Sequence, residues 1–569
     1  MCGFFGVVGE YDRQKAVRAL KSISHRGPDF SGIYEEDGLF LGHNRLYILD
    51  KSAIQPMRLE GAVLLFNGEI YNYKEFDAKS DTRAILKARK IYKDDFLSHL
   101  EGMFALALWE DGTLVLAKDR FGKKPLYYHH TGSQFLFASE IKAILTYLGG
   151  AAFNEKALSG YLSYGSLPNH QTFYKDIFKV QGGERVVFDG TLKKSGYILE
   201  KEPHSAADLE ELLSQSVRSR LQGDFEAASL LSGGIDSSLI SAMAKKEQGS
   251  LATYSIGYKE GRYSELPFAK EVAKHIKSDH NEVIYTKDDF FESLEYLLNH
   301  FDEPIGDSAS LPLWFLIRKI KKDGFKVVLS GEGGDEIFLG YRQYFEMADL
   351  LKARELKYKN WLKNYFKAHF SPNKEWEWYK RVWSDEILFR SSCEVFTDLQ
   401  KNLFLKANVK DGESLEFLDV GYPDREDFKF FTQVDLKVRL ESLYLHKLDM
   451  VSMASSIEAR TPILDEKILR AALSHPDRAK EPKYLLKQIA KKYLPPQIIK
   501  RKKRGFSYPH MEWLMQGGFD EKMVQIDKKA GFFKQNQLQF LIQNAKRNRF
   551  SRHFWLVLGF LLWFERRFL

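Results

Sequence analysis

The sequence contains few of the features that mark secreted or membrane proteins. Only two of its 569 residues are cysteine, Cys2 and Cys393, which argues against a disulfide framework and predicts a reducing, cytoplasmic setting. The longest apolar run, Phe554–Phe564, is about half of the roughly 20 residues that a membrane-spanning helix needs. No basic stretch followed by an apolar segment opens the chain, so no secretory signal is predicted. We expect no membrane span, and we expect Phe554–Phe564 to form a buried C-terminal helix.

The chain also lacks a strong charge imbalance, because its formal net charge is only +8. Much of the excess lies in the C-terminal half, above all in Lys500–Arg504. We interpret this run as a solvated surface or as positive charge near a phosphate-handling pocket, and we expect no nucleic-acid partner. A chain of 569 residues exceeds the size of a single hydrophobic core, so at least two domains are predicted.

The N-terminal part, up to about residue 195, is rich in short apolar or alternating runs separated by turn signals such as Asp111-Gly112. This pattern predicts a β-rich domain of layered antiparallel sheets. The expected strands are Phe4–Val8, Leu39–Leu41, Ala62–Phe66, Phe104–Trp109, Thr113–Ala117 and Phe135–Ala138.

The pattern changes near residue 205, where Ser205 and Asp208 can cap a helix that carries Leu209 and Leu213 on one face. Strands and helices then alternate, which predicts a parallel sheet with helices on both faces. The expected strands are Ala227–Leu231, Thr253–Gly257, Glu282–Tyr285 and Lys326–Leu329, and the expected helices are Ser238–Lys246, Leu266–Lys277, Phe290–Asn299 and Leu311–Lys321. From about Asp349 the chain is predicted to be mostly helical, and the linker between the halves is placed at Glu200–Ser205.

Chemistry is first indicated at the N-terminus, which reads Met1-Cys2-Gly3. Removal of Met1 would leave Cys2 with both a thiol and a free α-amino group. An α-amine has a pKa near 8 and can act as the base for its own thiol, so no separate histidine is required.

Several polar motifs with glycine at a turn follow Cys2: His25–Asp29, Arg45 with Asp50, Asn67–Asn72, Ser80–Thr82 and Asp119–Gly122. Together they resemble the N-terminal-nucleophile glutaminase domain of class II amidotransferases, which has an αββα fold. The resemblance implies that Cys2 attacks the amide of glutamine, while Asn67 and the Gly68 N–H form the oxyanion hole. It also implies that Arg45 pairs with the glutamine carboxylate and that Glu69 and Asp81 hold its ammonium group.

The sequence departs from that family at the rim of the expected pocket. Only Tyr73–Lys79 separates the Asn-Gly-Glu motif from Ser80, where relatives carry a longer segment. Arg83 stands where relatives usually have glutamate, and Asn44 where a basic residue is common.

A second motif, Ser232-Gly233-Gly234-Ile235-Asp236-Ser237-Ser238, follows the strand expected at Ala227–Leu231 and precedes a helix. A glycine turn between a strand and a helix N-terminus presents backbone N–H groups to an anion. Asp236 can hold Mg²⁺ against the phosphates. The motif lacks the Gly-Lys-Ser/Thr ending of a Walker A loop and resembles the PP-loop of ATP pyrophosphatases, which split ATP into AMP and pyrophosphate.

A second strand-to-loop crossing, Ser330–Glu336, follows Lys326–Leu329 and would lie at the carboxyl edge of the same sheet. With this loop, the run from Lys447 to Asp465 and the segment around Lys503, Gly505 and Phe506, the C-terminal half resembles the asparagine synthetase family. The resemblance implies Asp335 as a second Mg²⁺ ligand and Glu332 as the group that takes a proton from attacking ammonia. Lys447 would steady the acyl-adenylate, although Met450 stands where relatives often have arginine. The implied ATP contacts are Leu231, Ser232, Gly233, Gly234, Asp236, Ser237, Ser238, Ile256, Ser330 and Gly331.

The two resemblances cover the whole chain and predict a glutaminase domain at residues 1–200 and a doubly wound, parallel-sheet ATP pyrophosphatase domain at 205–569. They imply that ammonia released at Cys2 displaces AMP from an adenylated carboxylate, with ATP and Mg²⁺ as cofactors. The retained Cys2, Arg45 and Asn67 argue against a cyclising relative that needs no glutaminase. The retained Cys2, Asp236 and Asp335 argue against a non-enzymatic scaffold. The expected substrates are glutamine, ATP and a carboxylate acceptor, and the sequence leaves open whether the protein forms a homodimer.

The acceptor is L-aspartate or another carboxylate, such as a uronic-acid sugar. We expect no appended domain after Phe554–Phe564, which favours a small acceptor. An aromatic and basic region in Asp349–Asp435 could instead form a sugar groove, although core packing is the simpler interpretation. Its aromatic residues are Tyr358, Trp361, Tyr365, Phe366, Trp376, Trp378 and Tyr379.

Overall fold

The computed structural model describes residues 2–132, 134–197, 208–370, 374–410, 412–418, 425–501 and 507–569. The linker predicted at Glu200–Ser205, the cap at Ser205, most of the basic run and the segment Lys503, Gly505 and Phe506 lie outside these residues. Asp208 does cap the first helix of the C-terminal half, because its side chain accepts a hydrogen bond from the Glu210 N–H.

The N-terminal half contains two packed antiparallel sheets, as the strand pattern predicted. One sheet has the order β10-β8-β9-β1-β3-β2 and the other has the order β12-β11-β7-β6-β5-β4. The strands of the first are β1 (Cys2–Val8), β2 (Phe30–Glu36), β3 (Leu39–Arg45), β8 (Tyr127–Thr131), β9 (Gln134–Ala138) and β10 (Ile177–Lys179). Those of the second are β4 (Met57–Leu59), β5 (Ala62–Ile70), β6 (Gly102–Glu110), β7 (Thr113–Lys118), β11 (Glu184–Phe188) and β12 (Leu192–Gly196).

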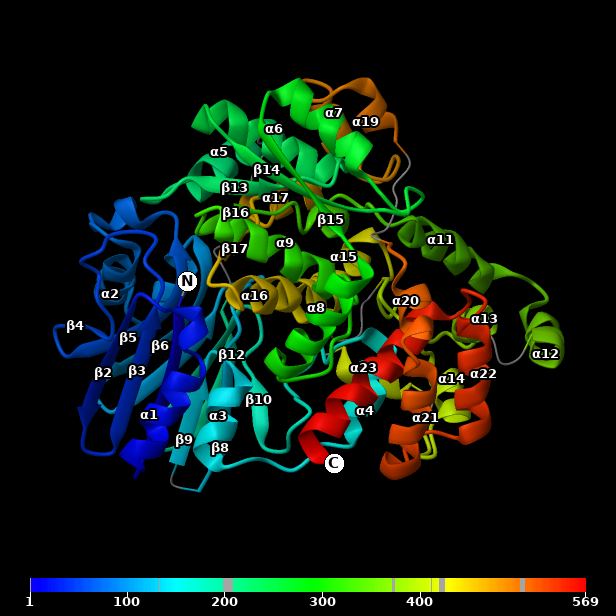
Figure 1. Cartoon of the computed structure of the whole chain (residues 1–569), viewed down its shortest axis with the longest axis horizontal. Coiled ribbons are helices and arrows are strands. Elements are labelled where there is room, and N and C mark those ends of the chain that lie inside the picture. Colours follow the sequence, from blue (N-terminus) through cyan, green and yellow to red (C-terminus); the bar gives the residue numbers. More distant parts are fainter. Residues whose placement is uncertain are drawn as a thin grey trace.

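Helices cover both outer faces of this pair of sheets and give the layers α-β-β-α (Figure 1). Helices α1 (Arg13–Ser22) and α3 (Ile141–Leu148) pack on the first sheet, and α2 (Asp81–Tyr92) packs on β5 of the second. The interior between the sheets is apolar because alternate residues such as Phe4, Leu41 and Leu65 point inward.

The C-terminal half is built on a parallel sheet with the order β15-β14-β13-β16-β17. Its strands are β13 (Ala227–Leu230), β14 (Ala252–Tyr258), β15 (Asp279–Tyr285), β16 (Val327–Leu329) and β17 (Glu458–Arg460). Figure 1 shows helices on both sides of this sheet, as predicted. On one side are α5 (Leu209–Arg220), α6 (Ile235–Gln248), α7 (Leu266–Ile276) and α17 (Glu466–Ser474), and α18 (Tyr484–Ala490) packs on α6. On the other side are α8 (Lys287–His300), α9 (Ser310–Lys322) and α16 (His446–Met453).

Four of these strands follow the sequence prediction within a few residues, whereas β17 was not predicted. It has only three residues and lies within a region of helices. It exists because its backbone completes the sheet beside β16, which is a tertiary interaction without local sequence signal.

The rest of the described C-terminal half is mostly helical, as expected. Its helices are α10 (Gly334–Ile337), α11 (Arg342–Leu351), α12 (Lys359–Phe370), α13 (Lys374–Trp383), α14 (Asp398–Phe404), α15 (Phe428–Asp435), a π-helix (Leu436–Leu445), α19 (Pro496–Lys500), α20 (His510–Gln516), α21 (Phe519–Ala530), α22 (Gln535–Ala545) and α23 (Ser551–Phe568). Among the described residues, no helix is both long enough and apolar enough to cross a bilayer.

Helix α23 contains the predicted buried segment, and every residue from Phe554 to Phe564 is buried. It packs beside α4 (Lys156–Tyr164) of the N-terminal half, and Phe173 places its ring 5.0 Å from that of Trp563. The two halves therefore share one apolar core.

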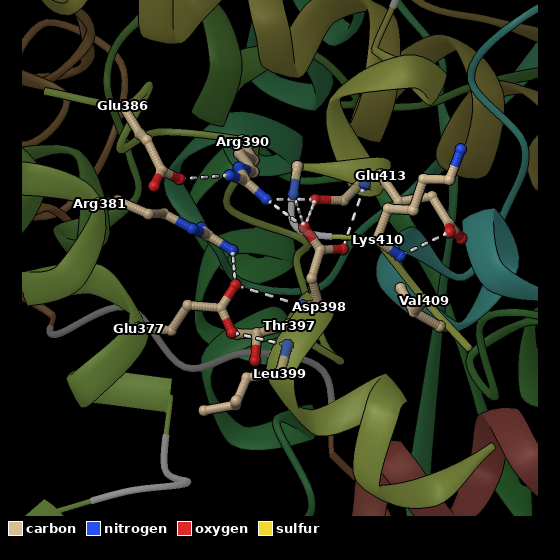
Figure 2. A network of polar contacts seen from close by, with 12 residues as sticks. Glu377, Arg381, Glu386, Arg390, Thr397, Asp398, Leu399, Val409, Lys410 and Glu413 are labelled. Carbon is tan, nitrogen blue, oxygen red and sulfur yellow. Dashed lines mark hydrogen bonds and ion pairs between the residues drawn. The ribbon is translucent and has the colours of Figure 1, made fainter. Parts of the chain in front are cut away.

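Buried ion pairs connect α13, the segment that follows it and α14 (Figure 2). Arg381 contacts Glu377 (2.7 Å) and Glu394 (2.8 Å), while Arg390 contacts Asp398 at 2.6 Å. Each of these buried charges has a partner, so removing one member of a pair would leave the other uncompensated in the interior and destabilise the region.

The aromatic residues of this region divide between core and surface. Trp376 is buried, and the ring of Phe366 packs against those of Tyr379 and Trp383. Tyr358 and Trp361, next to and on α12, are 75% and 64% exposed. The expectation of core packing is confirmed for the first group and wrong for the second, because the outer face of α12 has no neighbouring element among the described residues.

Candidate functional site

The N-terminal site forms where β1 and β3 meet the second sheet. Cys2 and Arg45 are paired residues on β1 and β3, and the Cys2 nitrogen donates to Asn67 Oδ1 at 2.9 Å. Asn67 Nδ2 is buried and has no hydrogen-bond acceptor among the described residues. A buried amide donor without an acceptor is suited to an oxyanion that forms during the reaction.

Gly68, next to Asn67, has a backbone conformation that other residues rarely adopt. Its φ is +151°, and a Cβ atom built at this position would lie 2.0 Å from the Met103 carbonyl oxygen. Glycine is therefore required for β5 to lie close to β6.

The remaining predicted glutamine contacts are Arg45, which pairs with Cys2 across β1 and β3, and the acidic residues Glu69 and Asp81. The Arg45 guanidinium donates to the carbonyl oxygens of Lys51 (2.9 Å) and Asp50 (2.5 Å), which hold it in place. Glu69 and Asp81 are buried, and burial raises the pKa of both carboxyl groups, that of Asp81 to about 6. Two buried acids of this kind would be stabilised as carboxylates by a ligand ammonium group.

The departures at the pocket rim leave this arrangement intact. Tyr73–Phe76 forms a short 3₁₀-helix, after which Ser80 caps α2 and Asp81 begins it. Arg83 points to solvent, and Asn44 is buried with its amide donating to the Leu20 carbonyl at 2.7 Å. The shortened segment therefore still places Asp81 near enough to Cys2 for its charge to raise the pKa of the Cys2 thiol.

Burial raises the pKa of the Cys2 thiol, while a hydrogen bond from the Leu46 backbone and the positive charge of Arg45 oppose this effect. A thiol of this kind needs a base to become a nucleophile. The predicted base is the Cys2 nitrogen itself, which donates to Asn67 Oδ1, and it becomes a free α-amine only if Met1, a residue outside the described part of the chain, is removed.

The C-terminal site is a cavity of about 1330 Å³ at the carboxyl ends of β13, β14 and β16. The predicted residues that line it are Leu231, Ser232, Gly234, Asp236, Ser237, Ile256, Ser330, Gly331, Glu332, Asp335 and Lys447. Gly233 and Ser238 do not line it. Gly233 has φ +72° and lies against α7, where a Cβ atom would be 2.7 Å from the Ala269 nitrogen, and Ser238 is buried in α6.

Two glycine-bearing loops meet in this cavity. A Cβ atom at Gly331 would lie 2.7 Å from the Ser237 nitrogen, and one at Gly334 would lie 2.3 Å from Asp236 Oδ1. The absence of side chains at these positions allows the loop after β16 to touch the loop after β13. Asp236 and Asp335, which are distant in sequence, are thereby brought together.

The sequence prediction missed the residue that joins these two aspartates. Lys483 places its ammonium group 2.7 Å from Asp335 Oδ1 and also contacts Asp236 Oδ2, and both carboxylates raise its pKa against the effect of burial. The two carboxylates thus converge on one cation, and oxygen donors of this kind suit Mg²⁺. The only local signal was the Glu481-Pro482-Lys483 turn before an apolar helix, which is not specific.

Lys447, the lysine that the sequence favoured, lies elsewhere in the same cavity. Its ammonium group pairs with Asp307 at 2.8 Å and lies 4.4 Å from the centre of the Tyr444 ring. Burial raises the pKa of Glu332, and Lys447 acts in the opposite direction. Lys447 and Glu332 are therefore close enough to interact, whereas Met450 is buried inside α16.

One residue joins the two sites directly. Arg460 on β17 places Nη2 3.2 Å from Glu69 Oε1, while its carbonyl oxygen accepts a hydrogen bond from the Ser330 N–H at 2.8 Å. A second connection runs through Arg26, which donates to the Cys2 carbonyl (3.0 Å) and to Asp449 (2.8 Å). The sequence indicated both segments as family-like but not that they touch.

Comparison with known proteins matches each half of the chain to a protein family. The family model described as "Asparagine synthase" matches residues 208–565, and the "Glutamine amidotransferase domain" model matches residues 1–198. "Asparagine synthetase [glutamine-hydrolyzing] 1" of Bacillus subtilis is 29% identical over 99% of this chain and 96% of its own length. "Asparagine synthetase B [glutamine-hydrolyzing]" of Escherichia coli is 33% identical over 63% of this chain and 67% of its own length. A putative asparagine synthetase of Mycobacterium tuberculosis is 28% identical over 99% of this chain and 95% of its own length. The chain belongs to the asparagine synthase family and is a glutamine-hydrolysing, ATP-dependent ligase.

Proposed function

We propose that this enzyme converts L-aspartate to asparagine through a β-aspartyl-adenylate, with glutamine as the nitrogen donor. The observation that carries the proposal is the pair of sites in one chain: a cysteine beside an unpaired amide donor, and a large cavity with two converging aspartates. The names of the relatives, which are asparagine synthetases along the whole chain, support aspartate as the acceptor.

In the N-terminal site, Cys2 attacks the glutamine side-chain amide after its proton passes to the α-amine. Asn67 Nδ2 and the Gly68 N–H stabilise the oxyanion, and such donors each contribute about 10²–10³ in rate. Arg45 binds the carboxylate of glutamine, while Glu69 and Asp81 bind its ammonium group. Ammonia leaves, and water hydrolyses the remaining thioester to glutamate.

In the C-terminal site, the loop after β13 binds the phosphates of ATP through backbone N–H groups and the hydroxyls of Ser232 and Ser237. Asp236 and Asp335 would hold Mg²⁺, which would neutralise the negative charge of the phosphates. The acceptor carboxylate displaces pyrophosphate from the α-phosphate, and Lys483 keeps the two aspartates in place. Glu332 then takes a proton from ammonia as the nitrogen displaces AMP.

Ammonia has to travel between the sites without being protonated. A small cavity of about 60 Å³ is lined by residues of both halves, among them Lys118, Glu303 and Lys447. Lys447 also lines the large cavity, so the small one adjoins it. This arrangement supports an internal route for ammonia into the C-terminal site.

The proposal is tested by supplying MgATP and glutamine with either L-aspartate or a uronic acid and measuring pyrophosphate release. Aspartate is expected to stimulate release well above the rate without acceptor. If release stays at background with aspartate while glutamine is hydrolysed, aspartate is the wrong acceptor. Stimulation by the uronic acid alone would then favour a sugar substrate.

A further inference from the structure

The π-helix Leu436–Leu445 brings an arginine into the large cavity that the proposed reaction does not use. It lies between α15 and α16 and makes a wider turn than an α-helix, which changes the direction of its side chains. Arg439 and Tyr444 from this segment line the cavity, together with Tyr341 and Ser392.

Neighbouring side chains hold the Arg439 guanidinium firmly. Nη1 donates to Ser392 Oγ (2.8 Å) and Nη2 to Tyr444 Oη (2.6 Å). The guanidinium lies over the ring of Tyr341, 3.9 Å from its centre. Ser392 in turn donates to Asp435, so the group is fixed from several sides.

Arg439 forms no direct ion pair with a carboxylate among the described residues, although the charges of Glu336 and Asp435 are near enough to interact with it. Asp435 is reached only through Ser392, and its oxygens already accept hydrogen bonds from Ser391 (2.6 Å) and Tyr344 (2.7 Å). Arg439 Nε is buried and has no acceptor within the described ranges. A fixed and largely desolvated cation with a free donor favours a bound anion.

The position of Arg439 indicates which anion this is. None of its hydrogen-bonding or ring contacts in the described structure involves the phosphate-binding loop at Ser232–Ser238. Tyr341 instead connects it to the second loop, because its hydroxyl donates to Glu336 at 2.6 Å. Tyr444 connects it to Lys447, whose ammonium group lies over the same ring. Arg439 therefore lies on the side of Glu332 and Lys447, where the acceptor must react.

We propose that Arg439 binds a second carboxylate of the acceptor, one that the reaction leaves unchanged. The acceptor is then a dicarboxylate, which L-aspartate is and a simple uronic acid is not. This inference rests on the proposed function and adds the residue that selects the acceptor.

The test compares two acceptors that differ only in this group, L-aspartate and β-alanine, which lacks the α-carboxylate. In Arg439→Gln, kcat/KM for aspartate is expected to fall about 10²–10³-fold, the usual effect of removing one partner of a desolvated charge pair. The value for β-alanine and the KM for ATP are expected to stay unchanged. Arg439→Lys should recover part of the aspartate activity, because lysine keeps the charge but not the forked geometry.

Lys429→Gln is the matched control, since it removes one positive charge from the exposed face of the preceding helix α15. Unchanged glutaminase activity in each variant shows that the chain is folded. An equal loss for both acceptors would show a structural role and overturn the proposal. A matching rise in the KM for ATP or in the inhibition constant of pyrophosphate would overturn it as well, by assigning Arg439 to the phosphates.

Failure of the proposed function gives a different result. If the wild-type enzyme ignores aspartate but releases pyrophosphate with another dicarboxylate, and Arg439→Gln loses that activity, the Arg439 subsite stands and aspartate does not. If only acceptors with one carboxylate are used, the subsite proposal is wrong while the ligase chemistry remains.

Discussion

In the N-terminal site Cys2, Arg45 and Asn67 are held on strands of two packed sheets, whereas in the C-terminal site Asp236 and Asp335 lie on loops that follow separate strands. The first site is buried, and its hydrogen bonds are set by strand register. The second is a cavity of about 1330 Å³ in which lysines stand between the acidic groups. A small, fixed substrate such as glutamine suits the first arrangement, and a large nucleotide with a second substrate suits the other.

Because of this difference, we expect that mutations can abolish glutamine hydrolysis at the first site without abolishing the ATP-dependent reaction at the second. Cys2→Ala should abolish glutamine-dependent product formation, with a loss of at least about 10³-fold, because the nucleophile is removed. Activity with added ammonium salts should remain, since the C-terminal cavity is untouched. Product is measured with each nitrogen source in turn. Equal loss with both sources would mean that the two sites form one inseparable unit.

Substitutions of Asp236 and Asp335 should do the reverse and abolish the ATP-dependent reaction without abolishing glutamine hydrolysis. Asp236→Asn and Asp335→Asn should each lower pyrophosphate release by about 10²-fold or more, because charge neutralisation at the phosphates is lost. Glutaminase activity should be retained in both variants. Pyrophosphate and glutamate are measured in the same reaction. Wild-type pyrophosphate release at ordinary Mg²⁺ would place the metal at other residues.

A change in pH should have a smaller effect, which tests the role proposed for the buried acid Asp81 in glutamine binding. Burial raises the pKa of Asp81 to about 6, so this group is ionised above that pH and neutral below it. Only the ionised form attracts the ammonium group of glutamine. The KM for glutamine should therefore rise as the pH falls through about 6, and the KM for ATP should not follow it. Asp81→Asn should have a high KM without this pH dependence, and an unchanged profile in that variant would assign the titration to another group.

The difference between the two sites also explains why the sequence predicted more of the first site than of the second. The N-terminal residues lie in short motifs that resemble the glutaminase family, so Cys2, Arg45, Asn67 and Asp81 were predicted together from that resemblance. In the C-terminal half the glycine loops were equally clear, but Lys483 and Arg439 reach the cavity from segments without a motif. Their positions depend on tertiary packing and, for Arg439, on a π-helix, neither of which leaves a periodic signal in the sequence.

The central claim is that nitrogen released at Cys2 enters the adenylated acceptor in the second site. It is tested most directly with glutamine labelled with ¹⁵N in its side-chain amide, together with MgATP and L-aspartate. The account predicts asparagine with ¹⁵N in its carboxamide, accompanied by equal amounts of AMP and pyrophosphate. Formation of ADP and orthophosphate, or release of the label as free ammonium without labelled asparagine, would contradict it.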